Sequence, residues 1–139
     1  DPGFLLVREA VKAGIEPEII PGASSLTFAI AASGLPSEKF AFYGFLPVKS
    51  GRRGDRLAKI AAEDKSVVIF ESPYRIGKLL GELAALIPNA QAAVIREATK
   101  IHQETIRGTL QELVAKTKDK NWKGECVLVV SKPLEEEEE

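Results

Sequence analysis

The stretch that decides the fold is Ser66-Val67-Val68-Ile69-Phe70, an uninterrupted apolar run rich in β-branched side chains. Such a run predicts a strand that is buried on both faces. Ser72-Pro73 follows, where we expect a serine cap and a proline at the first helical position. Apolar residues then recur at helical spacing as far as Pro88. A buried strand leading into an amphipathic helix is typical of a layered α/β protein.

Similar segments lie on both sides of this pair. We expect further strands at residues 40–45, 92–95, 102–107 and 125–130, and helices at 55–63 and 109–116, the last with Thr109 and Glu112 as a capping box. Upstream, the pattern predicts a helix from Phe4 to Gly14, a short strand at 17–21 and a helix at 23–33. The fold class is therefore α/β or α+β, with a mixed five-stranded sheet and flanking helices.

The length of 139 residues allows one compact core. The turn-rich residues 34–39 are the best candidate for a boundary. We expect residues 1–35 to be the remnant of an N-terminal domain, 36–132 to form the main domain, and 133–139 to be a disordered acidic tail. Asp1-Pro2-Gly3 leads directly into a helix without an initiator methionine, as in a chain cut from a longer one.

Composition restricts the classes of function. The net charge is −1, but without the five C-terminal glutamates residues 1–134 carry +4, which suits an anionic partner and is also ordinary for a soluble domain. No apolar run reaches the roughly 20 residues of a membrane span, and no secretory signal is present, so we expect an intracellular, cytoplasmic protein. The single cysteine, Cys126, lies in an apolar run and is expected to be a buried, inert thiol.

Several kinds of catalytic site are excluded by what the sequence lacks. It has no phosphate-binding glycine motif and no Cys/His set at metal-ligand spacing, so we expect no metal. The one histidine, His102, is expected to be solvated. Polar segments at the carboxyl ends of buried strands are better candidates, because open sheets bind ligands there. These segments are Glu71–Arg75, Arg96–Lys100 and the basic loop Gly44–Arg53.

A second candidate is the helix start after Pro21-Gly22. Its backbone amides, together with Ser24 and Ser25, offer hydrogen bonds to a polar ligand. Capping of the helix by either serine explains the same pattern.

Seven short strings, in this order, carry a family resemblance: Pro21-Gly22-Ala23-Ser24-Ser25, Gly34-Leu35-Pro36, Gly44-Phe45-Leu46-Pro47, Glu71-Ser72-Pro73-Tyr74-Arg75, Arg96-Glu97-Ala98-Thr99-Lys100, Gly108-Thr109-Leu110 and Lys123-Gly124-Glu125. Together they resemble the tetrapyrrole-methylase superfamily, and within it the branch that methylates a ribose 2′-hydroxyl of small-subunit ribosomal RNA. The resemblance implies a class III methyltransferase that binds S-adenosylmethionine between two domains and is usually a homodimer. Tyr74 departs from the pattern, since histidine is common at that position.

The resemblance also implies which residues line the cofactor site. They match positions near the cofactor in relatives: Ser24, Ser25, Ser72, Ala98, Glu125 and Cys126. Because half of the cofactor cleft is missing, we expect the isolated chain to bind little S-adenosylmethionine and to be inactive alone.

A ribose hydroxyl must lose its proton during methylation. Glu71 and Glu97 are the carboxylates at strand ends, and either is a candidate base if burial raises its pKa. The alternative is that Glu71 pairs with Arg75, and Glu97 with Arg96 or Lys100, as architecture.

Basic residues are candidates for RNA phosphate contacts and base stacking. The candidates are Lys49, Arg52, Arg53, Arg75, Arg96 and Lys100. A solvated helix face explains the neighbouring Arg56 and Lys59 equally well. Two rival functions remain: methylation of a tetrapyrrole or corrin by the same superfamily, and a non-catalytic RNA-binding or dimerisation module.

Overall fold

Five strands form one mixed sheet in the structure, a computed structural model that describes residues 3–133. The strands are β1 (Phe40–Phe45), β2 (Ser66–Glu71), β3 (Gln91–Arg96), β4 (Glu104–Thr109) and β5 (Cys126–Ser131). Their order across the sheet is β1-β2-β5-β3-β4, in which only β1 and β2 run parallel. The predicted mixed five-stranded sheet is confirmed.

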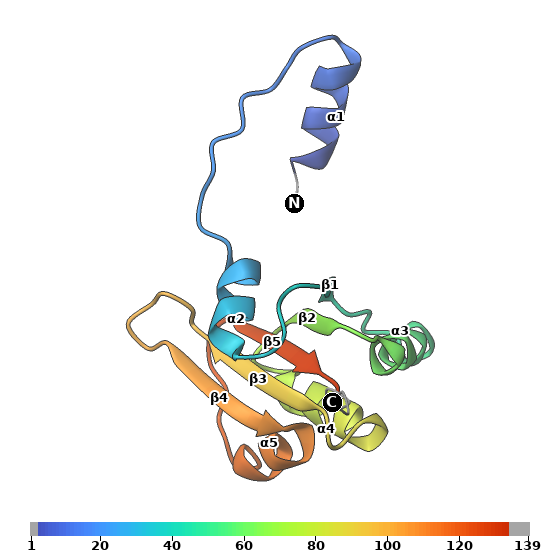
Figure 1. The fold of residues 1–139 in the computed structure, drawn as a ribbon, viewed down its shortest axis with the longest axis vertical. Helices are drawn as coiled ribbons and strands as arrows, with labels where there is room; N and C mark the ends of the chain where they lie inside the picture. The colour runs from blue at the N-terminus through green and yellow to red at the C-terminus, as the bar shows by residue number, and fades with distance from the viewer. Residues whose placement is uncertain (1–2, 134–139) are drawn as a thin grey trace, which may run out of the picture.

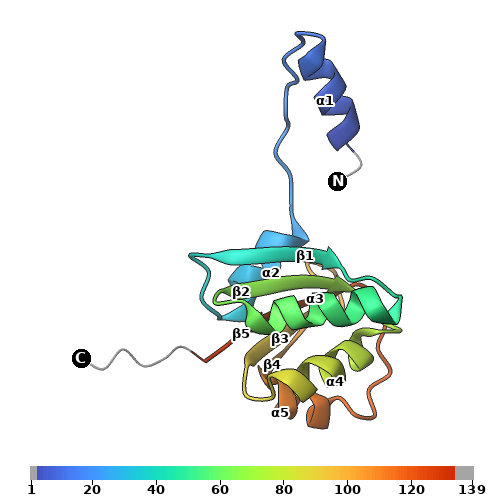
Figure 2. The ribbon, with the colours of Figure 1, turned by 90° about the vertical axis from the view of Figure 1, so that its right-hand side faces the viewer.

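Helices cover both faces of the sheet. On one face lie α3 (Ser50–Ala62), α4 (Ile76–Leu86) and α5 (Leu110–Lys116), and on the other lies α2 (Ser25–Ser33) (Figure 2). Successive strand residues point to opposite faces. Ile69 and Leu128 therefore join the core under α3, α4 and α5, whereas Val68 and Val129 pack with α2. The central strands β2, β3 and β5 are buried on both faces, which explains their continuous apolar runs.

The N-terminal region divides into two parts. Helix α1 (Phe4–Lys12) has no buried residue, and Figure 1 shows it set apart from the sheet at the end of an extended segment. Helix α2 instead packs through Ala29 and Ile30 on the sheet. The packed unit thus includes a helix that we expected before the boundary at residues 34–39. Most of the predicted acidic tail, residues 133–139, lies outside the described residues.

Some local predictions were wrong. Residues 17–21 form no strand, and Pro17 and Pro21 lack the N–H donors that a strand needs. Ser72 does not cap α4 with its side chain: the helix begins at Ile76, and the Ser72 carbonyl accepts hydrogen bonds from the backbone N–H groups of Arg75 and Ile76. The Thr109 cap is confirmed, since its hydroxyl accepts from the Glu112 amide at 3.1 Å.

Helix α3 starts five residues earlier than the predicted Asp55, and β4 starts at Glu104, which leaves His102 exposed in the preceding turn. Within residues 3–133, none of the helices combines the length and the apolar character needed to cross a membrane.

Candidate functional site

The strand register brings three polar segments together at the end of the sheet where β2 and β3 finish and β5 begins. β5 lies between β2 and β3 and runs antiparallel to both. Cys126, its first residue, is therefore paired with Glu71 at the end of β2 and with Arg96 at the end of β3. The segments after β2 and β3 and the segment before β5 meet for this reason.

A cavity of about 670 Å³ opens at these strand ends. Its lining combines aromatic and aliphatic side chains with hydroxyl and charged groups, a composition suited to a small ligand. The lining residues are Ser25, Phe45, Phe70, Glu71, Ser72, Pro73, Ile95, Glu97, Ala98, Lys100, Gly124, Glu125, Cys126 and Val127.

Five of the six predicted cofactor residues line this one cavity: Ser25, Ser72, Ala98, Glu125 and Cys126. The sixth, Ser24, lies in an adjoining hollow of about 370 Å³ that shares Ser25 and Ala98 with the cavity. No side-chain hydrogen bond caps the start of α2, so neither serine is committed to the capping role that we considered. The structure thus brings the predicted residues together, and their binding role stays a prediction.

One wall of the cavity is formed by the loop that joins β3 to β4, and Glu97 lies at its centre. Its Oε1 accepts hydrogen bonds from the Glu125 backbone N–H at 2.8 Å and from Lys100 Nζ at 3.2 Å, and Lys100 also reaches Glu125 Oε2 at 3.1 Å. The Glu125 amide, and secondly Lys100, lower the pKa of Glu97 below its usual value. A carboxylate held in its ionised form is a weak proton acceptor, which argues against Glu97 as a base.

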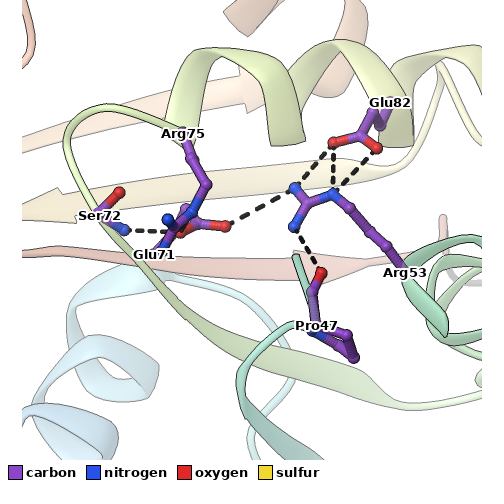
Figure 3. Close-up of polar contacts among 6 residues, drawn as sticks. All are labelled: Pro47, Arg53, Glu71, Ser72, Arg75 and Glu82. Atoms are coloured by element: carbon purple, nitrogen blue, oxygen red, sulfur yellow. Dashed lines mark hydrogen bonds and ion pairs between the residues drawn. The ribbon is translucent and has the colours of Figure 1, made fainter. Parts of the chain in front are cut away.

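The opposite wall, at the end of β2, is built around Glu71. Its side chain is 1% exposed, and its Oε1 accepts from the Ser72 backbone N–H at 2.8 Å and from Arg75 Nε at 3.0 Å. The pairing of Glu71 with Arg75 that we considered as architecture is thus present. On the far side of Glu71 lies Arg53, 3.7 Å from Oε2 (Figure 3).

Arg53 is buried, which argues against the contact with RNA that we expected of it. Its side chain is 3% exposed, and its guanidinium makes three hydrogen bonds of 2.8–3.1 Å to Glu82 on α4. The sequence did hold a signal for this. Arg53, Leu57 and Ile60 are spaced by four and three residues, which puts them on one helix face, and all three are buried.

The other basic candidates differ in how far they are already engaged. Lys49 and Arg52 are exposed at the start of α3, whereas Arg75 pairs with Glu71. Arg96 pairs with Glu104 and donates to the His102 and Lys123 carbonyls, and Lys100 is held between two carboxylates. The segment around Lys49 and Arg52 therefore offers the most accessible positive charge among the six.

Three contributors lie in or beside the segments considered from the sequence but were not identified as site residues. Phe45 and Phe70 pack edge to face at 5.7 Å between ring centroids and form the aromatic part of the lining. Gly124 has a φ of 79°, and a Cβ there would overlap the Glu97 carboxyl, so a larger residue would be strained and would displace Glu97. Alternation along β1 would put Phe45 on the face opposite Phe42, and a register shift between Phe42 and Gly44 brings both rings against Phe70. The contact between Gly124 and Glu97 joins segments far apart in sequence.

Cys126 has the properties of an inert thiol. It is 3% exposed, and burial is the main cause that raises its pKa to about 11. Within the part of the chain that the structure describes, no group of three or more His, Cys, Asp or Glu side chains is arranged to hold a metal ion.

Comparisons with known proteins find relatives of this chain in sequence and in fold. The family described as Tetrapyrrole (Corrin/Porphyrin) Methylases matches residues 1–114. Two proteins named ribosomal RNA small subunit methyltransferase I are similar over 132 residues. The protein from Xylella fastidiosa (strain 9a5c) is 44% identical over 93% of this chain and 48% of its own length. The protein from Thermotoga maritima is 42% identical over 94% and 59%. The chain thus spans about half the length of these curated relatives.

Solved structures share the fold at low sequence identity. A diphthine synthase has a TM-score of 0.65 at 18% identity, covering 92% of this chain and 53% of its own. A cobalt precorrin-4 methyltransferase has a TM-score of 0.63 at 18% identity, covering 94% and 60%. A uroporphyrin-III C-methyltransferase from Thermus thermophilus, solved with S-adenosyl homocysteine, has a TM-score of 0.56 at 23% identity, covering 91% and 58%.

Proposed function

Because the chain belongs to the tetrapyrrole (corrin/porphyrin) methylases, we propose that it forms one wall of the active site of an S-adenosylmethionine-dependent methyltransferase. The observation that carries the proposal is the cavity at the strand ends, where residues from α2, β2, β3 and β5 converge. The acceptor that we propose is the 2′-hydroxyl of a cytidine ribose in small-subunit ribosomal RNA.

The cavity suits the cofactor chemically. On one wall the carboxylates of Glu97 and Glu125 share a single amine, Lys100, which leaves a local excess of negative charge that suits a sulfonium cation. The Ser72 hydroxyl oxygen is buried and has no hydrogen-bond partner among the described residues, so a polar group of a ligand would satisfy it. Phe45 and Phe70 offer apolar surface to a flat ring such as adenine. When bound, S-adenosylmethionine supplies a methyl group that is already activated.

The RNA substrate is supported by the relatives and by charge. The similar proteins from Xylella fastidiosa and Thermotoga maritima carry the name ribosomal RNA small subunit methyltransferase I. Lys49 and Arg52 are exposed, only a few residues after Phe45 at the cavity wall. Positive side chains at this point suit RNA phosphates that approach the cavity. Such an enzyme would act in the cytoplasm, and we propose a homodimer, whose mass light scattering would measure.

The base that accepts the ribose proton is the least supported part of the proposal. Glu71 and Glu97 are each engaged in an ion pair and in a backbone hydrogen bond, which favours a structural role for both. Turnover of a double Glu71→Gln, Glu97→Gln variant is the direct test. Unchanged turnover would remove both residues as bases, whereas a loss in kcat at unchanged cofactor affinity would support one of them.

The test of the whole proposal uses the complete protein, with any residues that precede Asp1 included. S-adenosylmethionine labelled in its methyl group is supplied together with either small ribosomal subunits or precorrins. We expect label in the RNA, in 2′-O-methylcytidine after digestion. Label in the precorrin alone would favour the tetrapyrrole alternative. RNA binding without cofactor binding would favour the non-catalytic module.

A salt titration tests the phosphate contacts separately. If Lys49 and Arg52 bind phosphates, the RNA affinity of the complete protein falls steeply as salt rises, and replacing both by glutamine reduces the slope by about 2 units of log K against log salt. A flat salt response in the wild-type protein would argue against phosphate contacts. The isolated chain serves as a comparison for cofactor binding, and we expect little or none.

A further inference from the structure

Arg53 connects three segments from inside the protein. Besides its three hydrogen bonds to Glu82 on α4, its Nη1 donates to the Pro47 carbonyl at 3.3 Å, and its Nη2 lies 3.7 Å from Glu71 Oε2 (Figure 3). Pro47 belongs to the loop between β1 and α3, and Glu71 ends β2. A planar guanidinium with five donors can bind the Glu82 carboxylate through two nitrogens and still face Pro47 and Glu71, whereas an ammonium group has three donors on one nitrogen and cannot make the paired contact.

Glu71 links Arg53 to the cavity wall. Its Oε1 holds the Ser72 backbone N–H at 2.8 Å, and Ser72 and Pro73 line the cavity directly. Its Oε2 is buried and accepts no hydrogen bond from the described residues, so the charge of Arg53 is what it faces. The Glu71 carboxylate therefore lies between Arg53 on one side and the Ser72 amide and Arg75 on the other.

The charge of Arg53 is permanent. Its hydrogen bond to Glu82 is the main cause that raises its already high pKa. Without this cation, one buried face of Glu71 would be left against no positive group, which is costly in a low-dielectric interior. The open side of Glu71 is the cavity that it lines, so the carboxylate and the turn after it would move in that direction.

We propose that Arg53 is a positioning residue for the cofactor pocket, which acts through Glu71 to set the place of Ser72 and Pro73. The inference rests on the proposed function, because it takes the cavity to be the cofactor pocket. It also gives Arg53 a role different from the RNA contact expected from the basic stretch in which it lies.

The experiment compares three variants of the complete protein. Arg53→Gln removes the charge. Arg53→Lys keeps the charge but loses the planar, forked set of N–H donors. Arg107→Gln is the control. Arg107 is exposed, but it also joins two elements, since it donates to the Ala32 and Ser33 carbonyls at the end of α2, and it does not line the cavity. The measurements are the thermal midpoint, the affinity for S-adenosyl homocysteine by calorimetry, and hydrogen exchange of single amides.

We expect Arg53→Gln to bind S-adenosyl homocysteine roughly tenfold more weakly, since a small misplacement of a site wall has effects of this size or larger. Arg53→Lys should recover part of the loss, and Arg107→Gln should stay within about twofold of wild type although it is less stable. In Arg53→Gln the Ser72 amide should exchange faster, and by a larger factor than the Leu128 amide at the centre of the sheet, which follows global stability.

Two results would overturn the inference while leaving the proposed function intact. One is a folded Arg53→Gln protein with wild-type affinity, and the other is Ser72 exchange that changes only in step with Leu128. If Arg53→Gln does not fold, Arg53→Lys and Glu82→Gln are judged by the same two measurements. A wild-type protein that binds no S-adenosyl homocysteine would contradict the proposed function itself, and Ser72 exchange would still decide whether Arg53 sets the wall.

Discussion

The two charged walls of the cavity differ in how far their ion pairs are exposed to water. At the end of β2, the side chains of Arg53 and Glu71 are 3% and 1% exposed, and their charges are balanced inside the protein. Across the cavity, the side chains of Lys100 and Glu125 are 49% and 85% exposed, and water screens their ion pair. The first wall is a fixed frame, and the second can adjust to a ligand at small cost. Four substitutions or titrations test this contrast.

The largest effect is expected for Arg53→Met. This change leaves the buried Glu71 and the partly buried Glu82 short of a cation, which should lower the free energy of unfolding by about 3–5 kcal/mol. Urea denaturation of the chain measures it. Adding Glu82→Leu to the same protein should recover part of the loss, because both members of the pair are then apolar. A loss below about 1 kcal/mol in Arg53→Met would mean that the buried carboxylates at this wall do not depend on the charge of Arg53.

Gly124→Ala should come second, since it disturbs the exposed wall through the backbone and not through charge. A positive φ of 79° and the overlap of the new Cβ with the Glu97 carboxyl should cost about 1–3 kcal/mol of unfolding free energy. Gly81→Ala is the control, because Gly81 lies in α4 with open space at its Cβ position and should gain up to about 1 kcal/mol. Equal values for the two variants would contradict the proposed close fit at Gly124.

Lys100→Gln is expected to have a small effect. The side chain is half exposed, so removing its ion pairs should change the unfolding free energy far less than Arg53→Met does. Denaturation at low and at high salt should show that the difference disappears when charges are screened. A loss as large as that of Arg53→Met would remove the distinction between the walls.

The smallest effect concerns pH. The Glu125 amide and Lys100 lower the pKa of Glu97, so its folded pKa lies below its unfolded one. Its contribution to stability is therefore complete above the ordinary glutamate pKa of about 4.3, and it is lost as pH falls through the folded value. A carbon-13 NMR titration should give Glu97 a midpoint below the ordinary glutamate pKa of about 4.3, and a midpoint above that value would contradict the hydrogen-bonded arrangement.

The sequence was informative where structure depends on local pattern. The apolar runs at β2, β3 and β5 and the Thr109 cap were predictable, because strand burial and helix capping depend on residues that are neighbours in the sequence. The polar segments at the ends of β2 and β3 were also identified. Their meeting depends on β5 entering the sheet between β2 and β3, a pairing over long sequence distances that no local pattern specifies.

Arg53 illustrates why the site was only partly predictable. In a stretch containing Lys49, Arg52 and Arg56 it has the same charge as its neighbours, and only its position on the face of Leu57 and Ile60 distinguishes it. Its partner Glu82 lies on another helix, 29 residues away. A residue's charge can be taken from the sequence, but whether that charge faces water or another buried charge is decided by how two helices pack.

The position of β5 also has a consequence for how the protein is made. β5 follows the other four strands in the described part of the chain, yet it occupies the middle of the sheet, with β2 and β3 as its two neighbours. While the ribosome is still holding Cys126 to Ser131 in its exit tunnel, the β1–β2 and β3–β4 pairs have no strand to join them. The emerging chain must therefore keep two half-sheets with open edges apart from other chains until β5 emerges and pairs between them.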